Sequence, residues 1–206
     1  FRYQYANNPL YQKFVQLLGV NLNRINRIEH IPYLPISFFK THKIKTGEWE
    51  EIATFKSSGT TGNDTSNHYI KDLSPYHINS NKGFEQFYGP VEDYAILALL
   101  PSYLERQDSS LIYMVDYFIQ KSKYEQSGFF LYNTQELADR LIECIKKDIP
   151  ILLWGVTYAL MDFAEAHAIK LPKNSIVMET GGMKGRRKEL LREEVHQVLG
   201  KAFELK

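Results

Sequence analysis

The chain has 206 residues and a mass of 24.0 kDa, enough for one sizeable domain with or without a small appendage. Its 25 Lys and Arg residues nearly balance its 24 Asp and Glu residues, so we expect no nucleic-acid partner. No stretch approaches the ~20 consecutive apolar residues of a membrane span. The single cysteine, Cys144, excludes a disulfide within the chain and predicts a cytoplasmic protein.

Residues 1–76 are predicted to form a unit that precedes the main sheet. Residues 1–30 have the spacing of an amphipathic helix. Its expected apolar face comprises Leu10, Phe14, Leu17 and Leu18. Residues 31–40 are predicted to be extended, because two prolines three positions apart exclude a helix interior. Residues 44–56 suit a hairpin with Gly47 near its turn.

Residues 77–206 alternate between strand and helix patterns. Strands are expected at 94–100, 129–132, 151–154 and 175–179, with Gly155 breaking the third and Gly181–Gly182 the fourth. Helices are expected at 109–120, from a cap at Asn133 to Asp148, from a cap at Thr157 to about Ala168, and in the charged segment that ends near Leu199.

This order of elements predicts an α/β fold, with a mainly parallel sheet and helices on both of its faces. Ligands of such sheets bind at the carboxyl ends of the strands. The loops at 100–103, 154–156 and 180–183 are therefore where we expect the chemistry.

The common nucleotide and metal motifs are absent from the sequence. It has no G-x-x-x-x-G-K-[ST], G-x-G-x-x-G or H-E-x-x-H segment, and its six histidines show no metal-ligand spacing. We therefore predict no metal site within the chain. Cys144 occupies an apolar helix position, which favours a core residue over a nucleophile.

One loop is rich in hydroxyl side chains and glycine, and consists of Ser57, Ser58, Gly59, Thr60, Thr61 and Gly62. Its two glycines permit backbone conformations that are closed to other residues. Successive backbone N–H groups in such a turn form a concavity that binds anions. The loop is therefore predicted to bind phosphate, and a flexible linker is the alternative. The apolar-basic strand end at 52–56 favours the phosphate prediction.

The same loop resembles the phosphate loop of the adenylate-forming superfamily, which includes acyl-CoA synthetases, luciferases and peptide-synthetase adenylation domains. Three further stretches resemble the acyl-protein synthetase family of bacterial luminescence: residues 31–40, residues 100–106 with 109–111, and residues 179–186. The resemblance runs from about Ile31 to the end of the chain. It implies part of the large N-terminal domain of an adenylate-forming enzyme, with the C-terminal remainder absent.

Such enzymes use ATP and Mg²⁺ to convert a small carboxylic acid into an acyl-adenylate, which then acylates coenzyme A or a protein cysteine. The resemblance therefore implies an ATP-dependent acid–thiol ligase that acts on a fatty or aryl acid. The superfamily binds Mg²⁺ through a Tyr-x-x-Thr-Glu segment, which this sequence lacks. The ion is therefore expected to be bound mainly by residues missing from the chain, and this portion alone is expected to be inactive.

The resemblance also implies roles for the loops, but assigns no catalytic residue. The phosphate loop would hold the β- and γ-phosphates through backbone N–H groups and the hydroxyls of Ser58, Thr60 and Thr61. The adenine would contact Gly181, Gly182, Met183 and Lys184. The acyl group would lie at Pro101, Ser102, Trp154 and Gly155. The alternatives are that the paired glycines form a plain strand-to-helix turn and that the tryptophan packs in the core.

Two other functions stay open. The first is a non-catalytic nucleotide- or acyl-binding module with a degenerate adenylating fold, which the missing Tyr-x-x-Thr-Glu segment favours. The second is an unrelated doubly wound protein whose loop binds another phosphate compound. Failure to bind ATP would favour this second alternative.

Overall fold

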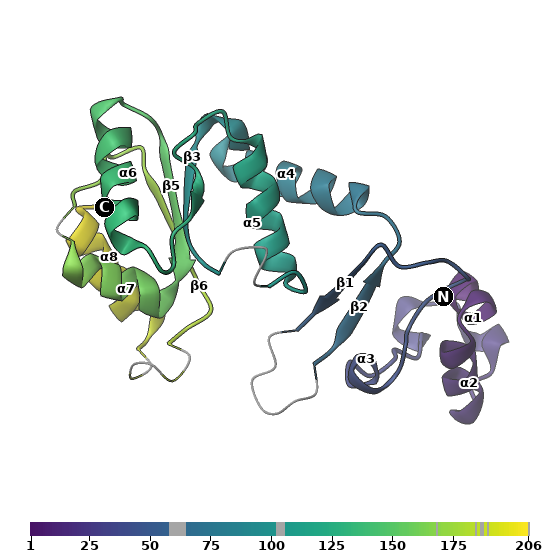
Figure 1. The fold of residues 1–206 in the computed structure, drawn as a ribbon. Coiled ribbons are helices and arrows are strands. Elements are labelled where there is room, and N and C mark those ends of the chain that lie inside the picture. The colour runs from purple at the N-terminus through teal and green to yellow at the C-terminus, as the bar shows by residue number, and fades with distance from the viewer. Residues whose placement is uncertain are drawn as a thin grey trace. The chain divides into compact units, whose positions relative to one another are not determined.

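The structure is a computed structural model that describes residues 1–57, 65–101, 106–167, 169–183, 185, 188 and 190–205 (Figure 1). The chain divides into two compact units. One contains Phe1–Tyr76 with Asp108–Ser110, and the other contains His77–Gln107 with Leu111–Lys206.

Short helices and one hairpin make up the first unit. The helices are α1 (Arg2–Asn7), α2 (Pro9–Leu17), α3 (Phe38–Thr41) and the 3₁₀ helices η1 (Leu22–Arg24) and η2 (Ile28–His30). Asn8 separates α1 from α2, and its buried side chain accepts a hydrogen bond of 3.0 Å from the Tyr11 backbone N–H. Asn8 therefore caps α2, with Pro9 at the first helical position where its missing N–H costs nothing.

The predicted apolar face of the first helix is wrong in part, because Leu10 and Phe14 are half-buried but Leu17 and Leu18 are exposed. Tyr11 and Val15 are the buried residues of α2, whereas Leu17 is 78% exposed and Leu18, beyond the helix end, is 54% exposed. The break at Asn8 gives α2 its own start and the helix ends at Leu17, so a spacing counted over 1–30 extends the buried face too far toward Leu17 and Leu18.

The segment 31–40 is also not extended throughout. Phe38 begins the single turn of α3, and its N–H donates to the Pro35 carbonyl at 3.0 Å. The restriction that a proline imposes falls on the residue before it, so a turn can form directly after Pro35.

The hairpin of the first unit has different strands from those expected at 44–56. Strand β1 (Ala53–Lys56) pairs antiparallel with β2 (Asn67–Ile70), so the loop between them is the hydroxyl- and glycine-rich loop. Gly47 does lie in a turn, with a φ of +77°, but its N–H donates to the Asn7 carbonyl at 2.9 Å.

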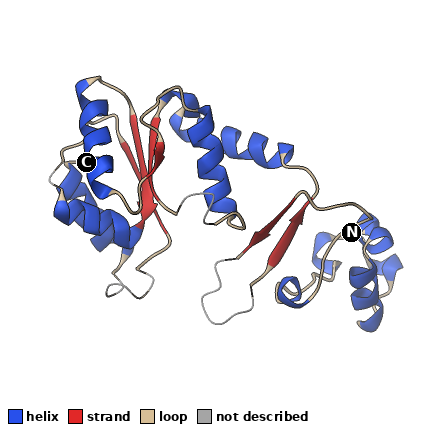
Figure 2. Cartoon of the chain, in the orientation of Figure 1, coloured by secondary structure: helices blue, strands red, loops and turns tan. Residues whose placement is uncertain are grey.

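The rest of the described chain contains six further helices and a four-stranded parallel sheet in the order β4-β3-β5-β6, and the elements in chain order follow. They are α4 (Ser74–Tyr88), η3 (Val91–Asp93), β3 (Ala95–Leu99), α5 (Ser110–Lys121), β4 (Gly128–Phe129), α6 (Thr134–Lys146), β5 (Ile151–Val156), α7 (Thr157–Ala166), β6 (Ile176–Thr180) and α8 (Arg192–Phe203). Helix α5 lies on one face of the sheet, and α6, α7 and α8 lie on the other (Figures 1 and 2). The predicted α/β class with a parallel sheet is therefore confirmed.

The two central strands form the core of the sheet. Every residue of β3 and β5 is buried, as their continuous apolar runs predict for strands covered on both faces. The cap of α6 is also confirmed, since Asn133 Oδ1 accepts from the Glu136 N–H at 3.2 Å. Cys144 on the same helix is fully buried.

Gly155 does not break its strand, contrary to the sequence prediction. It lies inside β5, paired with Leu99 of β3. A Cβ atom at this position would come within 2.8 Å of Leu160 Cγ and 2.9 Å of Leu99 Cβ. The glycine is therefore required by the close approach of α7 to the sheet, a packing constraint that local sequence does not express.

Candidate functional site

The connections of the sheet reverse direction between its central strands. From β3 the chain runs through α5 to β4 at one edge of the sheet, and from β5 it runs through α7 to β6 at the other edge. Helices α5 and α7 lie on opposite faces of the sheet (Figure 1). The carboxyl ends of β3 and β5 therefore flank a topological switch point, where open α/β sheets bind ligands. Pro101 follows β3 at this edge and is half-buried, and Thr157 follows β5.

A hydrogen-bonded chain joins the carboxyl ends of β5 and β6. The Thr157 hydroxyl donates to Glu179 Oε2 at 2.7 Å and accepts from the Gly182 N–H at 3.0 Å. A carboxylate can only accept, so the hydroxyl hydrogen is committed to Glu179 and a lone pair is left for Gly182. Thr157 is 2% exposed, so solvent has little access to this bond.

This geometry corrects the role that the sequence suggests for Thr157. The residue was expected to cap α7 with its side chain. It is instead the first residue of the helix, Val156 is at the cap position without a side-chain hydrogen bond, and the helix ends at Ala166. The threonine hydroxyl serves the neighbouring strand end 22 residues away.

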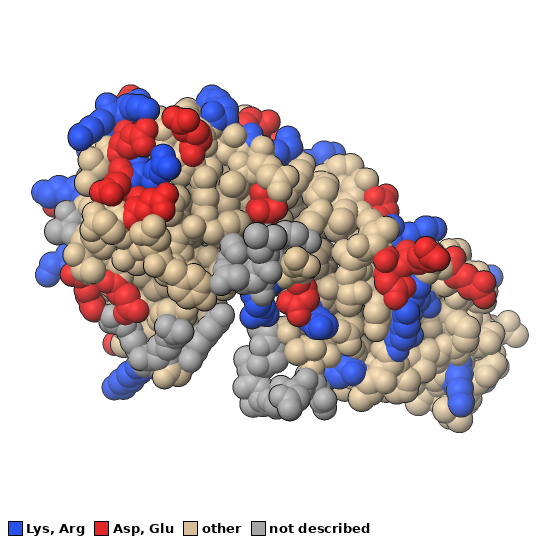
Figure 3. Space-filling view, viewed as in Figure 1, with Lys and Arg blue, Asp and Glu red and all other residues tan. Residues whose placement is uncertain are grey.

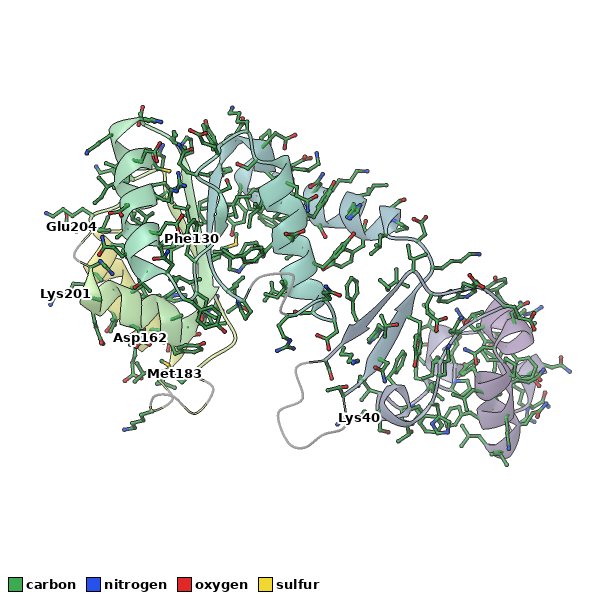
Figure 4. The ribbon with its side chains drawn as sticks, in the orientation of Figure 1. Lys40, Phe130, Asp162, Met183, Lys201 and Glu204 are labelled. Atoms are coloured by element: carbon green, nitrogen blue, oxygen red, sulfur yellow. The ribbon has the colours of Figure 1, made fainter. Side chains whose placement is uncertain are left out.

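The paired glycines end β6 as expected. Gly181 has a φ of +90° and Gly182 a φ of +69°, in the left-handed region where glycine alone carries little steric cost. Met183 comes directly after this turn and is 1% exposed, so its side chain is part of the core rather than of the surface. Figure 4 labels Met183 within the segment that follows β6.

Two cavities adjoin this strand end. One of about 200 Å³ is lined by Thr157, Glu179, Gly181, Gly182, Met183, Leu190, Arg192 and Val195. The other, of about 660 Å³, has walls that include Trp154, Glu179, Thr180, Arg192 and His196. Glu179 and Arg192 line both cavities, so each could present one carboxylate and one guanidinium to a polar ligand.

The residues proposed for the acyl group have different environments. Trp154 packs against Phe118 with ring centroids 6.5 Å apart, is 7% exposed and lines the larger cavity. It therefore serves core packing and also contributes a wall. Gly155 is buried between Leu99 and Leu160.

Most of the phosphate loop lies outside the described residues. This applies to Ser58, Gly59, Thr60, Thr61 and Gly62, and also to Ser102 and Lys184.

Ser57, the first residue of the loop, lies within the described residues and bonds to Ser66. Its N–H donates to the Ser66 carbonyl at 3.0 Å, and its Oγ accepts from the Ser66 N–H at 2.9 Å. Ser57 thus continues the contact between the two strands beyond the last β1–β2 pair, through one backbone bond and one bond accepted by its hydroxyl. The hydroxyl hydrogen is not used by this contact.

Cys144 lacks the properties of a reactive thiol. It is fully buried on α6, and this burial raises its pKa to about 11. A thiol of such high pKa carries almost no thiolate near neutral pH. The core role predicted for Cys144 is therefore confirmed.

Neither a single-sign charge patch on the face shown in Figure 3 nor a cluster of metal-binding side chains among the described residues indicates a ligand. Figure 3 shows Lys and Arg interspersed with Asp and Glu over the face in view. Within the part of the chain that the structure describes, no group of three or more His, Cys, Asp or Glu side chains could hold a metal ion. No described helix has the length and apolar character needed to cross a bilayer.

Comparisons with models of known protein families, with curated proteins and with solved structures find no match to this chain.

Proposed function

We propose that the chain is a nucleotide-binding part of an ATP-dependent acid–thiol ligase that works in the cytoplasm. The observation that supports this best is the left-handed Gly181–Gly182 turn, held by Thr157 at the carboxyl edge of a parallel sheet. Such an edge is where these sheets bind ligands, and a glycine turn lets a flat base lie against the backbone. The sequence resemblance of the 57–62 loop adds the phosphate site.

In the proposed reaction an oxygen of the substrate carboxylate attacks the α-phosphorus of ATP. The bond from that phosphorus to the bridging oxygen breaks, pyrophosphate leaves, and an acyl-adenylate forms. A thiolate then attacks the acyl carbonyl carbon and AMP leaves, which gives a thioester. The protein contributes by orienting the reactants and by donating hydrogen bonds where negative charge develops.

The proposed roles follow the loops. Backbone N–H groups of 58–62, with the hydroxyls of Ser58, Thr60 and Thr61, hold the β- and γ-phosphates, whereas the Ser57 N–H is committed to the Ser66 carbonyl. Gly181 and Gly182 lie against the adenine, with Met183 and Lys184 beside it. The acyl group lies near Pro101, Ser102 and Trp154. Gly155, which was also expected there, packs between Leu99 and Leu160 and has no room beside it for an acyl group.

The Mg²⁺ ion and the acyl acceptor are proposed to be held by other parts of the protein or by a partner. The described residues contain no group of His, Cys, Asp or Glu side chains that could hold Mg²⁺. The buried Cys144 is not the acyl acceptor, so the thiol belongs to coenzyme A or to another cysteine.

Calorimetric titration with an acyl-sulfamoyladenosine, a stable analogue of the acyl-adenylate, tests this function. We expect saturable binding that is tighter than that of sulfamoyladenosine, because the acyl group adds contacts. The absence of binding to either compound would contradict the proposal and would favour an unrelated phosphate-binding protein.

Pyrophosphate exchange then separates the ligase from a non-catalytic binding module. The module is the second candidate because the sequence lacks a Tyr-x-x-Thr-Glu segment. Exchange that depends on a carboxylic acid supports the ligase. Because residues 1–206 alone are expected to be inactive, the exchange is measured on the longer enzyme of which we propose this chain to be part; analogue binding without exchange for any acid there supports the module.

A further inference from the structure

We infer that Thr157 is a positioning residue for the nucleotide, and that it acts by fixing the Gly181–Gly182 turn through its hydroxyl. This inference rests on the proposed function and extends it to a residue outside the motifs that suggested it. Thr157 contributes no charge. Its role is to hold a backbone amide in place.

The turn needs such an anchor because of its composition. Two consecutive glycines have the largest conformational freedom of any dipeptide, and both adopt a positive φ here. The Gly182 N–H is held at 3.0 Å by a hydroxyl that belongs to the first residue of α7. Because that helix packs on β5 through Leu160, which is fully buried, the anchor is attached to the rigid core.

Glu179 makes the anchor directional. A threonine hydroxyl can rotate, and on its own it could offer Gly182 either its hydrogen or a lone pair. The bond of 2.7 Å to Glu179 Oε2 uses the hydrogen, so the lone pair that remains suits an amide donor. The three groups thus form one chain that runs from Gly182 through Thr157 to Glu179.

The hydrogen-bonded groups also line the cavity in which we expect a ligand to bind. Thr157, Glu179, Gly181 and Gly182 all contribute to the cavity of about 200 Å³. If the Gly182 amide were released, the turn would relax and the wall of this cavity would change shape. An effect on ligand affinity is therefore expected without loss of the fold.

Three variants of the full 206-residue chain test the role. Thr157→Val keeps the shape and removes the hydroxyl, and Thr157→Ser keeps the hydroxyl. Thr134→Val is the matched control, because Thr134 is also the first residue of a helix, α6, but is exposed. The readouts are the exchange rate of the Gly182 amide by NMR and the affinity for acyl-sulfamoyladenosine by calorimetry.

We expect Thr157→Val to speed the exchange of the Gly182 amide hydrogen. It should also lower the affinity for acyl-sulfamoyladenosine by roughly tenfold or more, as loss of a buried hydrogen bond typically does. Thr157→Ser should restore both readouts to within about threefold of the wild type, and Thr134→Val should change neither. Rescue by serine is the outcome that a role in packing alone would not give.

The possible failures are distinguishable. Faster Gly182 exchange with unchanged affinity would overturn the positioning role and leave the proposed function intact. No binding by the wild type would overturn both, even if Gly182 is protected. A Gly182 amide that exchanges freely in the wild type would overturn the inference without any variant, which covers the case in which Thr157→Val does not fold.

Discussion

Gly155→Ala is the substitution for which the structure gives the clearest expectation. Its new methyl group would lie 2.8 Å from Leu160 Cγ and 2.9 Å from Leu99 Cβ, distances that real Cβ contacts essentially never show. Both leucines are fully buried, and Leu99 is part of the central strand β3, so neither side can yield freely. Overpacking of this kind costs about 1–3 kcal/mol. For a chain of this length the melting temperature should fall by about 2–12 °C.

Urea unfolding followed by circular dichroism measures this cost. Gly83→Ala is the matched control, because Gly83 lies within α4 and a Cβ there would meet nothing within 4 Å. That control should be neutral or slightly stabilising, since alanine favours helix over glycine.

A double mutant tests the assigned cause. Leu160→Ala alone should destabilise by about 2–5 kcal/mol through the cavity it leaves. Combined with Gly155→Ala it should cost less than the sum of the two, because the clash with the Leu160 side chain is gone and only the contact with Leu99 Cβ remains. Strict additivity, or a Gly155→Ala variant as stable as the wild type, would refute the packing argument.

Three further expectations concern single side chains. Thr60→Ala and Thr61→Val should each weaken ATP binding roughly tenfold or more, as loss of a hydrogen bond to a charged group does, with unchanged urea midpoints; normal binding by both would make the loop a linker. Cys144 should react with a thiol reagent at pH 8 only after unfolding, because it is buried and its pKa is about 11; fast reaction of the native protein would contradict its burial. Hydrogen bonds from two lysines lower the Glu51 pKa to about 2, so their stabilisation is fully present above pH 4.5 and is lost as the pH falls toward 2. The Glu51→Gln variant should therefore show a smaller loss of stability over that range, and an unchanged profile would contradict the interaction.

The parts of the fold that follow from the sequence are those that local pattern encodes. The apolar runs of β3 and β5 predict strands buried on both faces, and Asn133 predicts the start of α6. The glycine pair predicts the end of β6. In each case the physical cause lies within a few neighbouring residues.

The parts that were missed depend on contacts between distant residues. Helix α4 has only Phe84 buried along its fifteen residues, so it offers little apolar periodicity to detect. Strand β1 pairs with a strand beyond the loop, and its true partner is not visible from the 44–56 pattern.

The candidate site shows the same limit. Thr157 follows a strand and resembles a helix cap in sequence, whereas its hydroxyl bonds to Glu179, 22 positions away. A threonine that follows one strand and a carboxylate near the end of the next strand were the available signal, because the carboxyl ends of parallel strands meet at one edge.

We propose that a nucleotide binds at Gly181 and Gly182, and the twelve glycines of the chain provide a direct spectroscopic test. The measurement is an NMR titration of the chain labelled with ¹⁵N-glycine, with acyl-sulfamoyladenosine as ligand. We expect saturable shifts of the Gly181 and Gly182 amides, and unchanged signals from Gly47, in a bend of the first unit, and from Gly83, in α4. Unchanged Gly181 and Gly182 signals at an excess of ligand would contradict the proposal.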